Sequence, residues 1–463
     1  MARTDLALVA HLMRRAGFGA SRAELEELAE KDYAELVEDL LHPERFPEVD
    51  ENVLRRYNDG EAIDVWASRW IFRMINSQRQ LQEKMALFWH QVFATAWYKG
   101  EHTLSMFQQI DMLRRLGLSN IRTILIELSK NPAMIFWLDN NENHKDEPNE
   151  NYGRELLELF SMGVGNYTED DVKQAARAFT GWNFEQPIPL YPHGHYTPKF
   201  VYREDDHDDS VKTFLGETGR LNGEDIVDII VKQPAAAKFV IRHLYNFFVA
   251  DEPQVPAWNT VPPRDPEAIE ALVEAYFESG GEMRSVLRVL FNSDFFKNAR
   301  QMRVKSPVEL VASTVKLAGT HRFPDSTLTS LAAASALMGQ HLLNPPTVEG
   351  WHTGKEWIDG GSLNDRVNFA VDHLADLDKP GMQAVIARLG SNGDTVTPAE
   401  FVDRVLDLAG PIEAGDETRD GLMEYAESGG DLAFRTEDER AASSARVGRM
   451  LQLVVASREY QFA

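Results

Sequence analysis

Residues 80–97 read QLQEKMALFWHQVFATAW, and this stretch decides the fold class of the chain. Its apolar residues repeat with the 3.6-residue period of an α-helix, at Leu81, Met85, Phe88, Trp89 and Val92. Further apolar side chains cover its other faces, and a helix that is apolar nearly all round is normally buried. The pattern therefore predicts one buried helix over 80–97 and a protein whose core is built from helices.

Helical patterns continue on both sides of this stretch. Two helix starts carry the signals of a capping box, Ser21 with Glu24 and Thr168 with Asp171. The helices expected before it are 6–16, 21–29 and 61–75. Those expected after it are 104–116, 121–130, 151–162, 168–180, 224–232, 234–249, 266–279, 283–290, 307–317, 363–377, 398–409 and 437–457. The Asn131-Pro132 pair is expected to end the run of helices in the first part of the chain.

Residues 183–222 have a different character. They contain four prolines and the β-prone segment 199–202, which together predict an irregular insertion with one or two hairpins. We therefore expect a mainly α fold, a large multi-helix globular body with a small β-hairpin-containing insertion. Because a chain of 463 residues is longer than a single hydrophobic core usually includes, we expect four parts. These are an N-terminal helical region 1–182, the insertion 183–222, a second helical region 223–379 packed on the first, and a C-terminal helical extension 380–463.

The composition excludes several classes of function. Asp and Glu number 73 against 48 Lys and Arg, a formal net charge of −25, so the surface repels nucleic acids and anionic lipids. The chain has no cysteine, which excludes disulfides, thiolate metal sites and a cysteine nucleophile. No long apolar run follows a basic start, so we expect no signal peptide and no membrane insertion. The cytoplasm is the simplest location, with the periplasm as the alternative.

Several segments match one family in order along the chain. They are residues 11–19, 84–90, 148–156, 163–172, 178–182, 207–208 with 212–216, and 344–346 with 350–351. Together they resemble the uncharacterised bacterial family called domain of unknown function 1800, over about residues 6–375. The resemblance implies a helical domain without an assigned activity. It also implies a protein partner of the alkaline-phosphatase and sulfatase class, because genes of this family often lie beside one for such an exported protein.

The first candidate site lies on the predicted helix 151–162. Asn151, Glu155 and Glu158 form one stripe of this helix, and carboxylates three residues apart can hold one metal ion or share a proton. The polar loop 139–150 precedes them, and ordered loops often carry function. The alternative is a solvated helix flank with ion pairs, since carboxylates on helices are normally exposed.

His90 is the second candidate, because a histidine in a buried helix needs hydrogen-bond partners. One interpretation is a core histidine satisfied by its neighbours. The other is that folding brings His90 to Glu155 and Glu158, which would form a His–carboxylate site for a divalent metal ion or for acid–base chemistry. We therefore predict Glu155, Glu158 and His90 as the catalytic residues.

Other polar residues are assigned to binding. The predicted substrate-binding residues are Asn151, Arg154, Lys212, Asn344 and Trp351. His207 and Asp208 are the predicted metal ligands, because they fall on a motif of the resemblance, and His193 with His195 form a further His-x-His candidate. The pair Arg14 and Arg15 can clamp a carboxylate or phosphate, or it can form internal ion pairs.

Two classes of function remain open on these residues. The first is a metal-assisted or acid–base enzyme, hydrolase-like, which would gather the histidine and carboxylates into one pocket. The second is a non-catalytic scaffold or partner protein for an exported phosphatase- or sulfatase-like enzyme. Such a protein would leave these residues scattered and expose an apolar patch instead.

Overall fold

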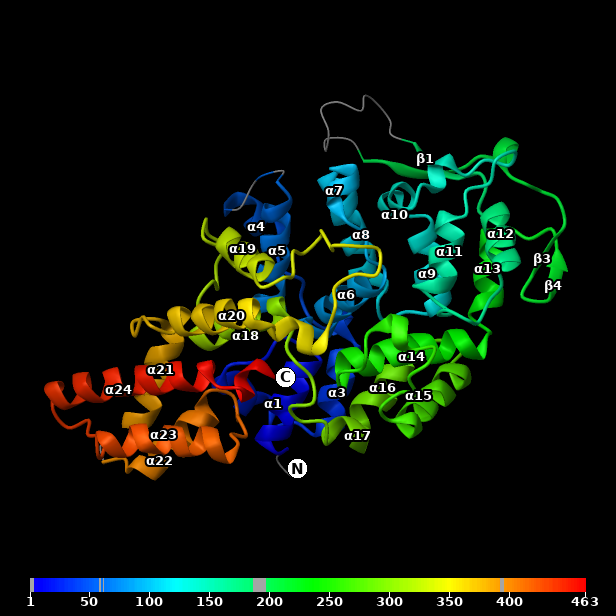
Figure 1. Ribbon diagram of the computed structural model, residues 1–463. Coiled ribbons are helices and arrows are strands. Elements are labelled where there is room, and N and C mark those ends of the chain that lie inside the picture. The colour runs from blue at the N-terminus through cyan, green and yellow to red at the C-terminus, as the bar shows by residue number, and fades with distance from the viewer. Residues whose placement is uncertain (1–3, 58–59, 61, 186–196, 392–394) are drawn as a thin grey trace.

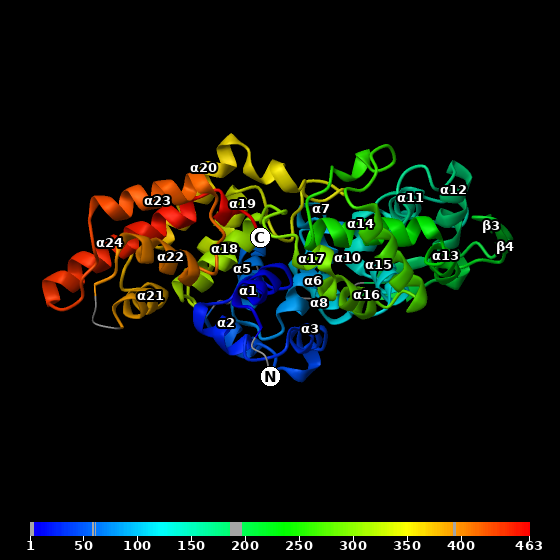
Figure 2. The same ribbon diagram turned by 90° about the horizontal axis from the view of Figure 1, so that it is seen from below.

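A computed structural model describes residues 4–57, 60, 62–185, 197–391 and 395–463 of the chain. Within these residues the chain forms 24 α-helices and two small antiparallel sheets, which confirms the mainly α fold with a hairpin-containing insertion. Figure 1 shows the helices α21–α24 at one end of the molecule and the strands β3 and β4 at the other, with α1 and α6 between them. The view in Figure 2 shows the same elongated arrangement.

The first part of the chain forms twelve helices, and the predicted core segment is one of them, α6. They are α1 (Leu6–Arg15), α2 (Arg22–Leu28), α3 (Tyr33–Leu41), α4 (Glu51–Tyr57), α5 (Ile63–Asn76), α6 (Gln80–Val92), α7 (Trp97–Gly100), α8 (Thr103–Leu116), α9 (Ile121–Ser129), α10 (Pro132–Trp137), α11 (Asn151–Glu158) and α12 (Glu169–Ala178). Leu81, Met85 and Trp89 of α6 are fully buried, as their stripe predicts. Both predicted capping boxes are present, at the starts of α2 and α12.

The insertion forms two hairpins. Strands β1 (Trp182–Glu185) and β2 (Lys199–Tyr202) pair antiparallel, and so do β3 (Lys212–Phe214) and β4 (Glu217–Gly219). The helices that follow are α13 (Gly223–Ile230), α14 (Pro234–Phe248), α15 (Pro266–Glu278), α16 (Met283–Asn292), α17 (Asp294–Lys297), α18 (Pro307–Ala318), α19 (Leu328–Leu337), α20 (Gly360–His373), α21 (Pro380–Gly390), α22 (Pro398–Leu408), α23 (Asp416–Ser428) and α24 (Glu437–Ala456). Short 3₁₀ turns are η1 (Pro43–Arg45), η2 (Asn140–Glu142), η3 (Glu204–Asp206), η4 (Val255–Ala257), η5 (Gly354–Ile358) and η6 (Glu459–Gln461).

Two predicted helices are shorter than expected. The helix expected over 80–97 ends at Val92, and the backbone N–H of Trp97 donates to the carbonyl of Leu343, on a distant loop, at 2.9 Å. The helix expected over 151–162 ends at Glu158. The break expected at Asn131-Pro132 is present, since α9 ends at Ser129, but a further helix, α10, starts directly after it. There Asn131 caps the backbone N–H of Ala133 at 3.0 Å, and proline is tolerated in the first helical turn.

The regions separated in the sequence lie against one another. Helices α18 and α19 pack against α5, and α24 packs against α20. The division into four parts stays a prediction, because these contacts cross its boundaries without defining units. Among the described residues, no helix combines the length and the apolar character needed to cross a bilayer.

Candidate functional site

The candidate site begins with two carboxylates on one short helix. Glu155 and Glu158 lie on α11, whose start is capped by the Asn149 side chain accepting the backbone N–H of Asn151 at 2.9 Å. Both glutamates are half-buried. The hydroxyl of Tyr167 donates to Glu158 Oε2 at 2.9 Å, which fixes the direction of that carboxylate. Glu155 thus stands beside a held carboxylate, without an ion pair of its own among the described residues.

A third carboxylate comes from a distant part of the chain. Burial and, to a smaller extent, the neighbouring charges of Glu158 and Glu349 together raise the pKa of Glu155 to about 7, while Arg154 opposes them. Glu349 belongs to the loop between α19 and η5, almost two hundred residues from α11. A carboxyl group with a pKa near neutrality exchanges its proton at physiological pH, which is the property that acid–base catalysis requires.

A cavity of about 210 Å³ opens near the end of α11, and neither Glu155 nor Glu158 lines it. Leu159, one turn after Glu155, lines it together with Glu349. The other lining residues are Gln91, Val92, His243, Asn246, Gln254, Val255, Pro256, Trp351, His352 and Thr353. Burial, with a smaller effect of the nearby Arg242, lowers the pKa of His243 to about 3, so this imidazole lines the cavity as a neutral group.

Backbone conformation places the loop that carries Glu349. Gly350 has a φ of +84°, and a Cβ at this position would lie 2.5 Å from the carbonyl oxygen of Gln91. Only glycine allows both this conformation and this approach to the end of α6 without strain. Trp351, which follows, is buried with its ring edge-to-face to His90 at a centroid distance of 5.3 Å. Contacts of both Gly350 and Trp351 therefore hold the loop against α6.

The structure does not bring His90 to Glu155 and Glu158. Its Nε2 accepts the backbone N–H of Leu343 at 3.1 Å, and Nδ1 has no partner among the described residues. Burial alone lowers the pKa of His90 to about 3, with no contribution from a carboxylate. The imidazole therefore supports the Glu349 loop as a neutral core group, behind the cavity wall formed by Trp351.

The predicted substrate-binding residues near α11 are engaged with the protein. Arg154 forms ion pairs with Glu150 at 2.9 Å and with Glu169 at 2.8 Å. Asn151 is exposed and donates to Asp139 at 3.4 Å. These contacts lie on the surface shared by α11 and α12. Of the five predicted binding residues, only Trp351 lines the cavity.

Asn344 and Lys212 also have protein partners. Asn344 Oδ1 accepts the backbone N–H of Tyr98 at 3.1 Å, which ties the start of the loop to α7. Lys212 is buried and donates to the carbonyl oxygens of Asp208 and Ser210. Burial lowers the pKa of Lys212, while Asp208 opposes this effect.

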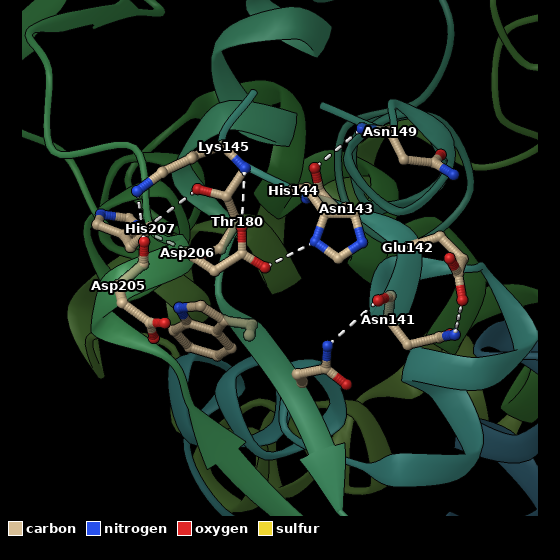
Figure 3. A network of polar contacts seen from close by, with 12 residues as sticks. Asn141, Glu142, Asn143, His144, Lys145, Asn149, Thr180, Asp205, Asp206 and His207 are labelled. Atoms are coloured by element: carbon tan, nitrogen blue, oxygen red, sulfur yellow. Dashed lines mark hydrogen bonds and ion pairs between the residues drawn. The ribbon is translucent and has the colours of Figure 1, made fainter. Parts of the chain in front are cut away.

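His207 and Asp208 lie in a separate polar network, and Figure 3 shows the part of it around His207. His207 Nδ1 donates to the carbonyl of Thr180 at 2.9 Å, and Asp208 pairs with Arg177 at 2.7 Å. The polar loop 139–150 reaches the same segment, because His144 pairs with Asp206 at 2.7 Å (Figure 3). These contacts fasten the insertion to the helices beneath it and occupy the side chains that were expected to bind metal.

The structure offers no ready metal centre in its described part. Across residues 4–57, 60, 62–185, 197–391 and 395–463, no three or more His, Asp or Glu side chains are grouped so that they could hold a metal ion. His193 and His195 lie outside the described residues.

Sequence reasoning missed several residues of the site. Glu349, His243 and Asn246 line the cavity, and Tyr167 donates to Glu158, yet none was predicted as a site residue. Glu349 had a usable signal, because it is the one acid in the proline-rich segment 344–351, next to a glycine and a tryptophan. His243 and Asn246 had none, since an amphipathic helix such as α14 carries polar residues in many settings.

Comparison with known proteins places the whole chain in one group. The family model described as "Protein of unknown function (DUF1800)" matches residues 11–462. Comparisons with curated proteins and with solved structures give no match.

Proposed function

We propose that this chain, which belongs to the DUF1800 family of proteins of unknown function, is an acid–base enzyme of the hydrolase type with Glu155 as its proton-transfer group. One observation carries the proposal: burial and the charges of Glu158 and Glu349 raise the pKa of Glu155 to about 7, and Glu349 lines the cavity. Enzymes commonly tune a glutamate to this range by burial and by a like-charged neighbour.

The three carboxylates have different tasks in this proposal. Glu155 takes a proton from a water molecule or a substrate hydroxyl and returns it to the leaving group. Glu158, oriented by Tyr167, and Glu349 keep the Glu155 proton affinity high by like-charge repulsion. The carboxylates are assigned to proton transfer and not to a metal ion, because the described residues contain no group of ligands suited to one.

The cavity limits the substrate. A volume of about 210 Å³ accepts a small molecule or one residue of a larger one. Gln91, Asn246 and Gln254 offer neutral hydrogen-bonding groups, and the lining contains no lysine or arginine. We therefore expect an uncharged polar substrate, an ester, amide or glycoside, in preference to a phosphorylated one.

A substrate panel tests the proposal. Chromogenic esters, amides, glycosides and phosphoesters are assayed with the wild type, with Glu155→Gln, and with Glu274→Gln as a control that alters an exposed carboxylate on α15. Hydrolysis should fall by about 10²–10⁴-fold in Glu155→Gln only. The wild-type rate should change with a midpoint near pH 7, and this midpoint should move to lower pH in Glu349→Gln. Equal activity of the wild type and Glu155→Gln would contradict the proposal.

A second candidate, the partner protein, is favoured by one surface feature. Phe323 and Leu337 are 79% and 76% exposed, before and at the end of α19, and large apolar groups this exposed often mark protein contacts. The partner would be the phosphatase- or sulfatase-like enzyme that the resemblance implies. Co-purification with that partner enzyme should be lost in Leu337→Asp and kept in Glu155→Gln. The reverse result would favour the proposal that this chain is itself an enzyme.

A further inference from the structure

The middle of the molecule holds more buried positive charge than negative charge. Five cationic side chains there are each 5% exposed or less: Arg15, Lys84, Arg303, Lys305 and Arg366. Arg14, half-buried, lies at their edge. In a chain with a formal net charge of −25, this concentration is not explained by composition. Buried charges normally have partners of opposite sign, because an unpaired one costs several kcal/mol.

Carboxylates neutralise only part of this group. Glu309 forms ion pairs with both Lys84 and Arg303, the latter at 2.7 Å. Asp251 accepts the backbone N–H of Val304 at 2.9 Å. Four of the cations form no ion pair with a carboxylate among the described residues. They are Arg14, Arg15, Lys305 and Arg366.

Backbone carbonyls take the place of acids around these four cations. Arg15 donates to the carbonyl of Ala299 at 2.7 Å, Arg14 to that of Gly410 at 2.6 Å, and Lys305 to that of Tyr460 at 2.8 Å.

Several N–H groups still lack an acceptor. Nε and Nη1 of Arg15 and Nη1 of Arg366 are buried and have no partner among the described residues. Carbonyl dipoles satisfy hydrogen bonds but supply no net negative charge. The local potential therefore stays positive.

A small cavity opens next to this group. Its volume is about 60 Å³, and Arg14 and Lys305 line it between α1 and the last residues of the chain. Figures 1 and 2 both show the C-terminal end beside α1. A water molecule needs roughly 10–15 Å³ of such space. The cavity therefore has room for a few waters or for one small oxyanion, and not for a sugar or a nucleotide.

The other charged residues of the lining already have partners. Arg300 pairs with Glu413, and also with Asp5 at 3.7 Å. The carboxylate of Glu459 accepts the backbone N–H of Gly415 at 3.1 Å and the Thr418 hydroxyl at 2.9 Å. Among the lining cations of the described part of the chain, Arg14 and Lys305 are thus the two that form no ion pair with a carboxylate.

We propose that this cavity binds one small tetrahedral oxyanion, inorganic phosphate or sulfate or the phosphoryl end group of a small ligand, between the guanidinium of Arg14 and the ammonium of Lys305. Arginine presents a planar fork of N–H groups to such an anion and lysine a compact charge, and hydrogen bonds between ions are the strong ones. Arg15 and Arg366 contribute positive potential from behind. The site is distinct from the carboxylate cavity, and its ligand is an anion, whereas the substrate expected in that cavity is uncharged.

Lys305 gives the proposal a signature in solution. Burial lowers the pKa of Lys305 well below its usual value, and the charges of Arg14 and Arg366 add to this effect. An anion placed beside Lys305 would raise that pKa again, so binding should draw a proton from the buffer at each pH where part of the free protein carries Lys305 as the neutral amine. Calorimetry in two buffers of different ionisation enthalpy measures this uptake directly.

Thermal unfolding with added anions tests the site. Phosphate, sulfate and chloride are compared at equal ionic strength with the wild type, Arg14→Gln, and Arg388→Gln as a charge-matched control that alters an arginine paired with Glu26. Phosphate and sulfate should raise the melting temperature of the wild type and of Arg388→Gln in a saturable way. The apparent affinity should fall about tenfold or more in Arg14→Gln.

A second variant covers the case in which Arg14→Gln does not fold. Ala20 lines the mouth of the cavity and is half-buried, so Ala20→Asp adds a negative charge there without disturbing the buried cations. This variant should lose the phosphate effect. Unchanged binding in Ala20→Asp, or equal effects of phosphate, sulfate and chloride on the wild type, would overturn the proposal.

Glycerol phosphate distinguishes a free anion from the phosphoryl end group of a small ligand. If glycerol phosphate binds, the cavity accepts a phosphoryl end group. If inorganic phosphate binds and glycerol phosphate does not, the ligand is the free anion.

Discussion

Replacing Glu155 by glutamine should make the protein more stable at alkaline pH and leave its stability unchanged in acid. Glutamine resembles the protonated carboxyl in shape and cannot ionise. The pKa of Glu155 is about 7 in the folded chain against 4.5 as its ordinary value. Folding therefore favours the protonated form, and the wild type loses stability as the pH rises from about 4.5 through about 7.

The size of the effect follows from these two values. Their difference corresponds to at most about 3 kcal/mol, reached above about pH 8. Partial exposure of Glu155 makes this an upper bound. For 463 residues at about 2.1 cal/mol/K each, the unfolding entropy is about 1 kcal/mol/K. The melting temperature of Glu155→Gln should then exceed that of the wild type by up to about 3 °C at about pH 8.5, and by nothing at about pH 4.5.

Melting curves followed by circular dichroism across this pH range measure the difference. The difference in melting temperature between two variants at the same pH contains no contribution from groups whose pKa the substitution does not change. Glu274→Gln, on an exposed face of α15, should show no pH-dependent difference from the wild type. A constant difference between Glu155→Gln and the wild type at every pH, or a variant less stable than the wild type in alkali, would refute the reasoning.

Three further substitutions test the packing around the site and the core, each by chemical denaturation. Gly350→Ala should destabilise the protein by about 2 kcal/mol or more, because its Cβ would lie 2.5 Å from the carbonyl oxygen of Gln91 at a φ of +84°; an effect below about 0.5 kcal/mol would contradict the close approach. Glu309→Gln should cost about 3–5 kcal/mol, because it leaves the buried Lys84 without its counter-charge, and added salt should not reduce that cost. Thr168→Ala should cost about 1 kcal/mol by removing the cap of α12, and Thr168→Ser should recover most of it.

The elements of this fold were predictable where their signals are local. The stripe of α6 repeats within four residues, and a capping box joins positions three apart, so both can be recognised without knowing what surrounds them. Helices α3, α4, α7, α10, α17, α19, α21 and α23 were not predicted. Helix α19 shows why. It consists largely of alanine and leucine and has no polar face, so its sequence pattern does not indicate which side is buried.

The candidate site was predictable only in part. The glutamates of α11 follow from the helical spacing of Glu155 and Glu158, and their neighbour Tyr167 lies close in sequence. The pairing of His90 with these glutamates was a hypothesis about long-range geometry. The structure gives His90 a backbone partner at Leu343 instead, because the chain after α19 folds back over the end of α6.

From the sequence alone came the helical class, the hairpin insertion, the capped helix starts, the strongly negative charge and the family likeness. These depend on composition and on interactions between residues a few positions apart. The tertiary structure alone decided that the charge of Glu349 acts on Glu155, and that three buried cations and the half-buried Arg14 gather without ion pairs to carboxylates among the described residues. Such groups meet only after helices from opposite parts of the chain have packed, and their pKa values are then set by the burial and the neighbouring charges that packing creates.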